Sequence, residues 1–302
     1  MTKTCFAVPQ GTIYIRADGS IDPPTAPIST VDNITYTLTG DISLSETNDA
    51  LRVERSNVIL DGSNYIIHSV PGGGGVGLYT TINVTVKNFN VDGGSVGIGL
   101  YDSSYCNIVD NNLTSSILYG SGVWLGNSFN NTVDNNTVSN RGSGIYFIDS
   151  NYNIATNNSL TNNSEGLWFY ENCFNNTFVN NNITTNAVGI KFSFSPNNNN
   201  VIYHNNFMNN SSQVSSSGST NLWDNGLEGN YWSDYNGTDS NQDGIGDTPY
   251  FIDENNIDHY PLMTQYVIPE FPSFLVLPLF FIATLLAVIV YKRKHPQNQS
   301  PD

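Results

Sequence analysis

The chain has 302 residues, a length that suits one continuous domain with end pieces, and 26 acidic against 10 basic residues give it a formal net charge of −16 at pH 7. Over residues 57–290 the basic side chains are Lys87, Arg141 and Lys191. Nucleic acids and polyanionic uronate polymers both require a basic stripe on the protein that binds them, so we expect neither as a ligand.

Residues 1–50 are predicted to form an N-terminal lead-in strand and cap. A β-rich run at residues 12–16 precedes the turn signals ADGS and DPP. Many Asn-x-Ser/Thr acceptor sites predict a glycoprotein outside the cell. Residues 1–10 lack the apolar core of a secretory signal. We therefore expect the true start to lie upstream, with the signal peptide missing from this N-terminus.

Residues 51–226 contain a unit that recurs every 22 to 25 residues. An Asn-rich turn before one apolar residue lies between consecutive landmarks of the repeat. The landmark is a glycine followed by an aliphatic residue, at Gly97, Gly122, Gly144, Gly166 and Gly189. A fixed period of this size is typical of stacked repeats.

The repeats predict short strands, because alternating apolar residues are interrupted by Asn, Gly and Ser. Strands this short bury an interior only when each pairs in parallel with its equivalent one turn later. We therefore predict an all-β parallel β-helix of about seven to eight coils. Stacking would also align asparagines into a hydrogen-bonded ladder. The predicted column is Asn107, Asn131, Asn153, Asn176 and Asn200.

Alignment on the glycine landmark places aromatic residues on the outer face. Alternation along the strand turns the landmark aliphatic inward and its neighbours outward. The outward aromatic residues are Tyr101, Trp124, Tyr146, Trp168 and Tyr170. Rings at successive coils suit pyranose faces, so we predict a glycan-binding surface. The alternatives are that this face packs against the terminal segments or a neighbouring molecule, or has no partner.

Polar residues follow the same strands at Asp102, Asn127, Asp149 and Glu171. Asp149 and Glu171 on adjacent coils could approach to about 5 Å, the carboxyl separation of a retaining glycosidase. Asp102, Asp149 and Glu171 are therefore candidate catalytic residues of a polysaccharide hydrolase or lyase. The competing interpretation is that they are ordinary solvated residues at strand ends.

A C-terminal cap is predicted over residues 227–264, and it contains an acidic loop. Oxygen donors at alternate positions around a glycine are what Ca²⁺ needs from a tightly curved chain. The donors would be Asp239, Asn241, Asp243, Ile245 and Asp247. The twelfth position of the loop is Tyr250, so the bidentate glutamate of an EF-hand is absent. We predict a calcium site, with a plain Asn/Asp/Gly turn as the alternative.

Copper prefers clustered His, Met or Cys side chains, and no such cluster is visible in the sequence. The histidines are scattered at His68, His204, His259 and His295. Cys106 and Cys173 lie about three repeats apart, roughly 14 Å at one strand spacing per coil, which exceeds the reach of a disulfide. We therefore predict free thiols and no copper site.

Residues 265–273 are predicted to be a proline-containing linker before an uncharged, mostly apolar stretch at 274–291. Eighteen residues span about 27 Å as a helix, close to the thickness of a bilayer core. The basic tail, 292–302, begins with KRK, which places it in the cytoplasm and the solenoid outside. This predicts one transmembrane helix, with a buried soluble helix as the alternative.

Several motifs carry a resemblance to a known family: IYIRADGS at residues 13–20, the repeats, GNYWSDY at 229–235 and DGIGDTPY at 243–250. Over residues 12–263 the chain resembles archaeal surface proteins of the NosD-like family, which implies a right-handed parallel β-helix. NosD itself serves copper insertion into nitrous oxide reductase, and the wider superfamily includes carbohydrate-binding modules and sugar hydrolases. We do not carry over pectinase-type hydrolysis, because this sequence has no Asp-Asp pair or Gly-His-Gly motif.

The tripeptide PEF at residues 269–271, with the apolar stretch and KRK, is similar to the PEF-CTERM sorting signal of archaea. That resemblance implies an archaeosortase-like processing enzyme, while the longer tail leaves plain transmembrane anchoring open. We expect a membrane-anchored extracellular β-helix that binds carbohydrate or other cell-envelope components without turning them over. A polysaccharide hydrolase or lyase is the alternative, and a NosD-type copper-maturation accessory protein is a third, less favoured reading.

Overall fold

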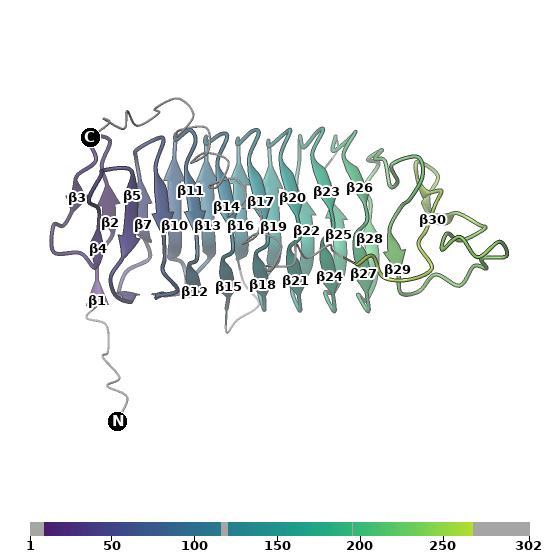
Figure 1. Ribbon diagram of the computed structural model, residues 1–302, viewed down its shortest axis with the longest axis horizontal. Coiled ribbons are helices and arrows are strands. Elements are labelled where there is room, and N and C mark those ends of the chain that lie inside the picture. The colour runs from purple at the N-terminus through teal and green to yellow at the C-terminus, as the bar shows by residue number, and fades with distance from the viewer. Residues whose placement is uncertain (1–8, 116–119, 195, 268–302) are drawn as a thin grey trace, which may run out of the picture. The chain divides into compact units, whose positions relative to one another are not determined.

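The structure is a computed structural model that describes residues 9–115, 120–194 and 196–267. The described chain up to Tyr266 forms one compact unit, and the second unit begins at Val267 and continues outside the described residues. Figure 1 shows successive coils stacked side by side, each contributing short strands. The described part of the chain is all-β, and its strands form a right-handed type of parallel β-helix with about eight turns.

Three sheets run the length of the coils. Sheet A contains β1 (Pro9–Gln10), β6 (Ile42–Leu44), β9 (Ile66–Ser69), β12 (Asn90–Gly93), β15 (Asn112–Thr114), β18 (Thr137–Ser139), β21 (Ser159–Thr161), β24 (Asn182–Thr184), β27 (Asn206–Met208) and β29 (Tyr231–Trp232). Sheet B contains β28 (Ser212–Ser215), β25 (Val188–Phe192), β22 (Glu165–Phe169), β19 (Ser143–Ile148), β16 (Ser121–Gly126), β13 (Val96–Tyr101), β10 (Gly74–Tyr79), β7 (Asp49–Val53), β2 (Ile13–Ile15) and β3 (Ile21–Asp22).

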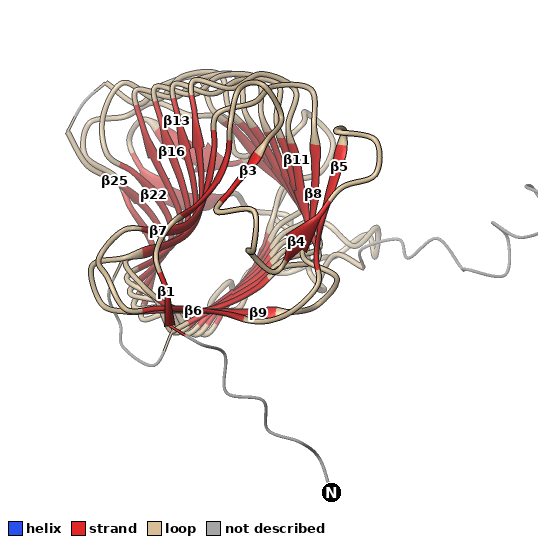
Figure 2. Ribbon diagram, turned by 90° about the vertical axis from the view of Figure 1, so that its left-hand side faces the viewer, coloured by secondary structure: helices blue, strands red, loops and turns tan. Residues whose placement is uncertain are grey.

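Sheet C contains β26 (Val201–Tyr203), β23 (Thr177–Val179), β20 (Ile154–Thr156), β17 (Thr132–Asp134), β14 (Asn107–Val109), β11 (Thr85–Lys87), β8 (Ile59–Asp61), β5 (Thr35–Leu38) and β4 (Ile28–Ser29). A separate hairpin pairs β30 (Tyr250–Asp253) with β31 (Asn256–Asp258). Seen along the stack in Figure 2, the three sheets form three sides around a common interior. The first parallel pairs of the three sheets begin with β1, β2 and β5, which all come from the region predicted as a lead-in.

The glycine landmark explains how the coils stack in sheet B. Ile98 pairs with Val123, and Val123 pairs with Ile145, so equivalent aliphatic residues lie in register. A Cβ atom built at Gly144 would lie 2.4 Å from the carbonyl oxygen of Gly166 on the next coil. Only glycine allows that approach, because a contact this short would push the coils apart.

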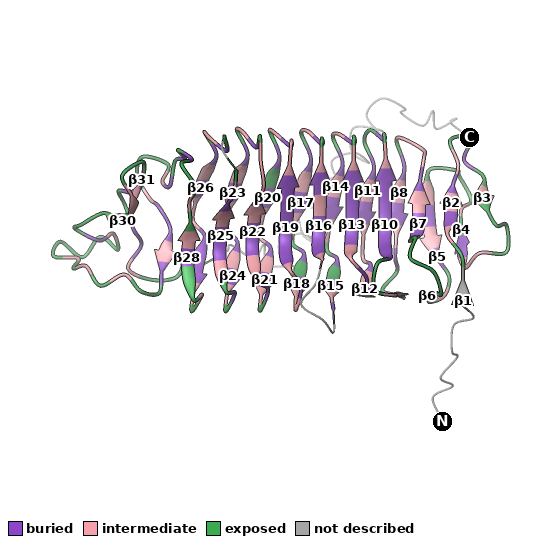
Figure 3. Ribbon diagram, turned by 180° about the vertical axis from the view of Figure 1, so that it is seen from behind, coloured by how far each residue is buried: buried purple, intermediate pink, exposed green. Residues whose placement is uncertain are grey.

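The interior is a continuous ladder of apolar side chains. Rings of Phe147, Phe169 and Phe192 stack at 5.1 and 4.8 Å along sheet B, and Phe178 meets the first two edge-on from sheet C. Figure 3 shows the buried residues of the sheet B strands in purple. Stacked interior residues remove apolar surface from water over the whole length of the coils.

An asparagine ladder is present, but its predicted first member is wrong. Asn131, Asn153, Asn176 and Asn200 are buried, and each side-chain oxygen accepts a hydrogen bond from the preceding coil. Asn107 instead pairs with Thr132 within the strands, and the N–H of Cys106 donates to Asn131 Oδ1 at 2.9 Å. The predicted column was therefore shifted by one residue at this coil.

The C-terminal end of the stack is covered by an aromatic and acidic cap. Trp232 stacks on Phe207 at 4.3 Å and on Tyr250 at 4.2 Å. Asp258 is buried in the β30–β31 hairpin and accepts hydrogen bonds from the Trp232 indole and the Asn230 N–H, both at 2.8 Å. The hairpin thus pairs polar groups that an open last coil would expose.

Within the described residues there is no helix long and apolar enough to cross a membrane. The predicted transmembrane stretch 274–291 and the basic tail 292–302 lie outside the described residues, as does the linker beyond residue 267. The membrane anchor therefore stays a prediction from sequence.

Candidate functional site

The outer face of sheet B carries a column of three large rings. Trp124 on β16 pairs with Tyr146 on β19, which pairs with Trp168 on β22. The Trp124 and Tyr146 rings stack at 4.3 Å, and Trp168 meets Tyr146 edge-on at 5.0 Å. Their alignment follows from the parallel register, since one residue per coil occupies each outward position.

Tyr101 and Tyr170 lie beside this column rather than in it. Tyr101 pairs with Gly126, two residues beyond Trp124, and its ring stacks on Tyr79 at 4.8 Å. Tyr170 follows the end of β22, and its ring centroid lies 5.9 Å from that of Trp168. The predicted single stripe is therefore two adjacent columns on the same face.

Tyr146 was expected to face solvent, but it is only 6% exposed. The Trp124 and Trp168 rings on either side cover it. Burial raises the pKa of the Tyr146 hydroxyl above its ordinary value, with smaller contributions from neighbouring Tyr170 and other groups. Tyr146 thus forms the floor between two partly exposed indole rings.

A cleft of about 440 Å³ opens beside these rings. Ser121 and Ser143, adjacent in the register, bring their hydroxyl oxygens to 3.3 Å. The cleft is lined by Ser95, Val96, Gly120, Ser121, Trp124, Gly142, Ser143, Tyr146 and Trp168. Aromatic walls with a few hydroxyl and backbone groups are the usual lining of a small-ligand site.

Arg141 supports the cleft from inside the protein. Its side chain is fully buried, and its guanidinium donates to the carbonyls of Thr114 at 2.7 Å and Gly93 at 2.9 Å. Longer bonds reach three further carbonyls, those of Gly94, Leu113 and Ser121. Burial lowers the pKa of Arg141 to about 10. Sequence reasoning identified Arg141 only as one of few basic residues and missed this role. Arg141 occupies the turn position that Asn163 occupies one coil later.

Trp168 is held in place by polar partners at its edge. Its indole N–H donates to the Ser193 hydroxyl at 2.9 Å. The Lys191 ammonium lies 4.5 Å from the ring centroid and also pairs with Glu165 at 2.8 Å. These contacts fix the ring orientation, and they place the charge of Lys191 beside a neutralising carboxylate.

The predicted acidic residues lie in a turn beyond sheet B. Asp102 and Asp149 have left-handed backbone conformations, with φ of 54° and 49°. The Asp102 carboxylate accepts a hydrogen bond from Asn127, and the Asp149 carboxylate accepts one from Asn172 at 2.8 Å. Asn172, which has a φ of 52°, is therefore the equivalent of Asp149 on the next coil.

Glu171 occupies a different position from the one that column alignment gave it. The Asp149 N–H donates to the carbonyl of Glu171 at 3.0 Å, and the coil of Glu171 contains one extra residue in this turn. Asp149 and Glu171 thus come from adjacent coils but not from equivalent positions. Their role as a catalytic pair stays a prediction.

The predicted calcium loop satisfies its oxygens with donors of its own. The Asp239 carboxylate accepts from the N–H groups of Asp243 at 3.2 Å and Gly244 at 2.9 Å. Asn241 donates to Asp243 Oδ2, and the Ile245 N–H donates to Asp243 Oδ1. This is the hydrogen-bond pattern of an Asx-rich turn.

The last predicted ligand, Asp247, accepts hydrogen bonds from the N–H and hydroxyl of Ser240. These bonds and one from Thr238 lower the pKa of the Asp247 carboxyl. Across the described ranges, no three His, Cys, Asp or Glu side chains are arranged to hold a metal ion. Calcium binding stays a prediction, which melting curves with and without EGTA test.

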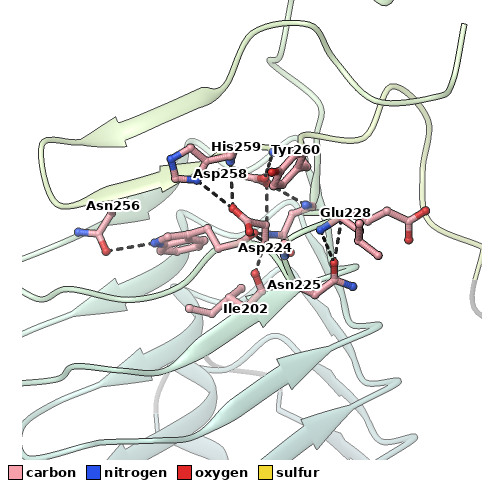
Figure 4. Close-up of polar contacts among 12 residues, drawn as sticks. Ile202, Asp224, Asn225, Glu228, Asn256, Asp258, His259 and Tyr260 are labelled. Carbon is pink, nitrogen blue, oxygen red and sulfur yellow. Dashed lines mark hydrogen bonds and ion pairs between the residues drawn. The ribbon is translucent and has the colours of Figure 1, made fainter.

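The histidines of the described chain each meet one carboxylate. His204 lies 2.7 Å from Glu228, and His259 lies 3.0 Å from Asp224 in the cap (Figure 4). His68 lies 3.6 Å from Asp92. The thiols of Cys106 and Cys173 are free, as predicted, and they are buried. Nothing in the described geometry gathers the soft ligands that copper requires.

Known proteins share parts of this sequence and this fold. A curated relative in Stutzerimonas stutzeri, the probable ABC transporter binding protein NosD, is 35% identical over 92 residues, which cover 30% of this chain and 21% of that protein. The match thus spans about a fifth of the relative's length.

Solved structures resemble part of the chain at low identity. A mutant of the periplasmic alginate epimerase AlgG is 16% identical with a TM-score of 0.42, over 70% of this chain and 71% of that chain. The A-module of the mannuronan C-5 epimerase AlgE6 from Azotobacter vinelandii is 13% identical with a TM-score of 0.36, over 70% and 88%. These likenesses carry no functional argument.

The family comparison covers most of the coils. The family described as periplasmic copper-binding protein (NosD) matches residues 25–237, which extend from before β4 into the cap. This match includes the ladders, the aromatic columns and the cleft described above. The chain belongs to the NosD family.

Proposed function

We propose that the chain is an extracellular carbohydrate-binding β-helix that holds a neutral glycan of the cell envelope on sheet B without cleaving it. The observation that carries this proposal is the column of Trp124, Tyr146 and Trp168 bordering a cleft of about 440 Å³. Fixed aromatic faces beside hydroxyl groups suit the apolar faces and hydroxyls of pyranose rings.

The charge of the chain supports a neutral ligand. The formal net charge is −16, and Lys191 beside the cleft is paired with Glu165. A polyanionic chain would meet repulsion here, because unpaired basic side chains are what attract such polymers.

Binding without turnover is favoured by the state of the nearby carboxylates. Asp102 and Asp149 each accept a hydrogen bond from an asparagine of the next coil, so these carboxylates stabilise the turns. A general acid or base instead has to reach a proton of the substrate. The alternative is a polysaccharide hydrolase or lyase that uses Asp102, Asp149 and Glu171. Experiments have to distinguish this enzyme from a protein that binds the glycan without cleaving it.

The copper chemistry named for the family is not part of this proposal. The His68, His204 and His259 rings lie with separate carboxylates, and the described residues contain no metal-holding group. These residues do not fit a copper site, so no role in copper delivery is assigned to them.

The proposal places the solenoid outside the cell, held by the predicted segment 274–291. The family is described as periplasmic, which agrees with an extracytoplasmic β-helix. Membrane insertion through this segment, and processing by an archaeosortase-like enzyme, form part of the proposal.

Tryptophan fluorescence tests the binding role. Neutral glucans, mannans and galactans are titrated into the full chain, and the Trp124→Ala and Trp168→Ala variants are compared with Phe251→Ala, an exposed ring in the cap. We expect each tryptophan variant to weaken binding by at least about tenfold and the control to bind normally. Equal binding by all four proteins would refute the site, provided that their melting temperatures agree.

A further inference from the structure

A second cleft lies on the same face of sheet B, at its N-terminal end. It has a volume of about 210 Å³, and the side chains that shape it are Tyr14, Asp49, Arg52 and Tyr79. Neither the predicted aromatic stripe nor the predicted acidic residues included any of these four. Unlike the cleft beside Trp124, this one is surrounded mainly by polar groups, including Thr47.

The carboxylate of Asp49 lies in a space that two glycines leave open. A Cβ atom built at Gly74 would come within 2.1 Å of Asp49 Oδ1, and one at Gly77 within 2.2 Å of Oδ2. Later coils carry side chains at the Gly74 position, such as Val96 and Ser121. The sequence of β10 therefore makes room for this carboxylate.

Two further groups are fixed around Asp49. The Tyr79 hydroxyl donates to Asp49 Oδ2 at 2.6 Å, and the Arg52 guanidinium lies 3.8 Å from the centroid of the Tyr79 ring. Tyr79 in turn stacks on Tyr101 at 4.8 Å. Burial raises the pKa values of both Asp49 and Tyr79, which shows that this pair is partly withdrawn from water.

Arg52 has donor capacity to spare. Its Nε atom is buried and makes no hydrogen bond within the described chain, although Glu54 Oε1 lies 3.5 Å away. The Arg52 side chain as a whole is 39% exposed and lines the cleft, so its outer guanidinium N–H groups can donate to a ligand oxygen. The arginine charge is opposed by both Asp49 and Glu54, so the cleft does not favour an anion over a neutral hydroxyl group.

The two clefts are joined along one register. Arg52 pairs with Gly77, Gly77 with Gly99, and Gly99 with Trp124. These three strand steps amount to about 14 Å. The intervening glycines lie under the rings of Tyr79 and Tyr101, so aromatic rings cover the surface between the two clefts.

We propose that the cleft of Asp49, Arg52 and Tyr79 is a second sugar subsite, which binds the hydroxyls of a neutral hexopyranose unit in the glycan that stacks on Trp124 and Trp168. This inference rests on the proposed function and adds the direction in which the glycan lies and the dependence of its affinity on chain length. The glycan lies along the coil axis, and only an oligosaccharide that reaches both clefts gains the full affinity.

The test uses the full chain and neutral glucan, mannan and galactan oligosaccharides from the disaccharide to the hexasaccharide, with binding measured by calorimetry. Tyr79→Phe removes only the hydroxyl, and Asp49→Asn removes the charge of the carboxylate. Tyr65→Phe is the matched control, because Tyr65 is an exposed tyrosine outside sheet B.

We expect wild-type affinity to rise with oligosaccharide length. Tyr79→Phe and Asp49→Asn should lower hexasaccharide affinity by about tenfold while disaccharide affinity and the control stay unchanged. Wild-type length dependence with no loss of hexasaccharide affinity in either variant would overturn this subsite but leave the Trp124 site standing. No binding of any neutral oligosaccharide by the wild type would overturn both.

Discussion

Replacing Asn176 by alanine should strongly destabilise the stack, because this side chain joins three coils. Asn176 is fully buried. Its oxygen accepts from the Asn153 N–H at 2.9 Å and from the Asn153 amide, and its own amide donates to the Ser150 carbonyl and to Asn200, both at 3.0 Å. Loss of the side chain leaves the Asn153 N–H and the Ser150 carbonyl buried without these partners.

An unsatisfied buried polar group costs about 1–3 kcal/mol, so two such groups predict a loss of about 2–6 kcal/mol for Asn176→Ala. Urea unfolding followed by circular dichroism measures this loss as a lower midpoint. The matched control is Asn112→Ala, since Asn112 is exposed and its side chain makes one long bond of 3.4 Å to Asn90. The control should change stability by less than about 0.5 kcal/mol. Equal midpoints for the two variants would refute the ladder as a stabilising element.

Three further predictions concern buried charged and reactive groups. Arg141→Lys keeps the charge but has too few donors for five carbonyls, so it should lower stability by about 2–4 kcal/mol in the same unfolding assay; an unchanged midpoint would contradict this. Burial raises the pKa of Asp258 to about 6 from an ordinary 3.8. The protonated carboxyl therefore contributes fully to the free energy of unfolding below pH 3.8, and this contribution is lost as the pH rises through 6. Between pH 4 and pH 7 the wild type should therefore lose about 2 kcal/mol relative to Asp258→Asn, and parallel pH profiles would refute the assignment. Burial also raises the pKa of Cys106, and that of Cys173 to about 12, so a thiol reagent should modify at most one cysteine, Cys5, before unfolding and all three afterwards.

The fold was predictable because its signals repeat. Gly97, Gly122 and Gly144 recur with an aliphatic neighbour, and the register pairs those neighbours directly. A periodic pattern averages over several coils, so one irregular coil does not hide it. The same reasoning identified Trp124 and Trp168 as residues on one outer column.

The errors arose where a coil departs from the average. One extra residue in the turn after β22 makes Asn172, not Glu171, the equivalent of Asp149. Asn107 lies one residue beyond the ladder position, which Cys106 occupies, and a periodic pattern does not resolve a shift of one residue, although such a shift reverses which side of a strand faces inward. Periodicity is a coarse measure, and side-chain positions depend on single insertions.

Other features have no sequence signal of their own. Tyr146 is covered by two neighbouring indoles, a fact that depends on ring orientation. Arg141 is buried where the carbonyls at the ends of β12 and β15, on earlier coils, accept its hydrogen bonds. Asp49 and Tyr79 are 30 residues apart and meet only through the register of β7 and β10. Contacts of this kind follow from the three-dimensional path of the chain.

The central claim is that the face of sheet B binds a glycan and does not cleave it. The most direct measurement incubates the purified full chain with insoluble neutral polysaccharides and scores retention and reducing-end release in the same samples. Our account predicts retention that Trp168→Ala abolishes, with no reducing ends released. Release by the wild type that disappears in Glu171→Gln would contradict it and identify the chain as a polysaccharide-cleaving enzyme.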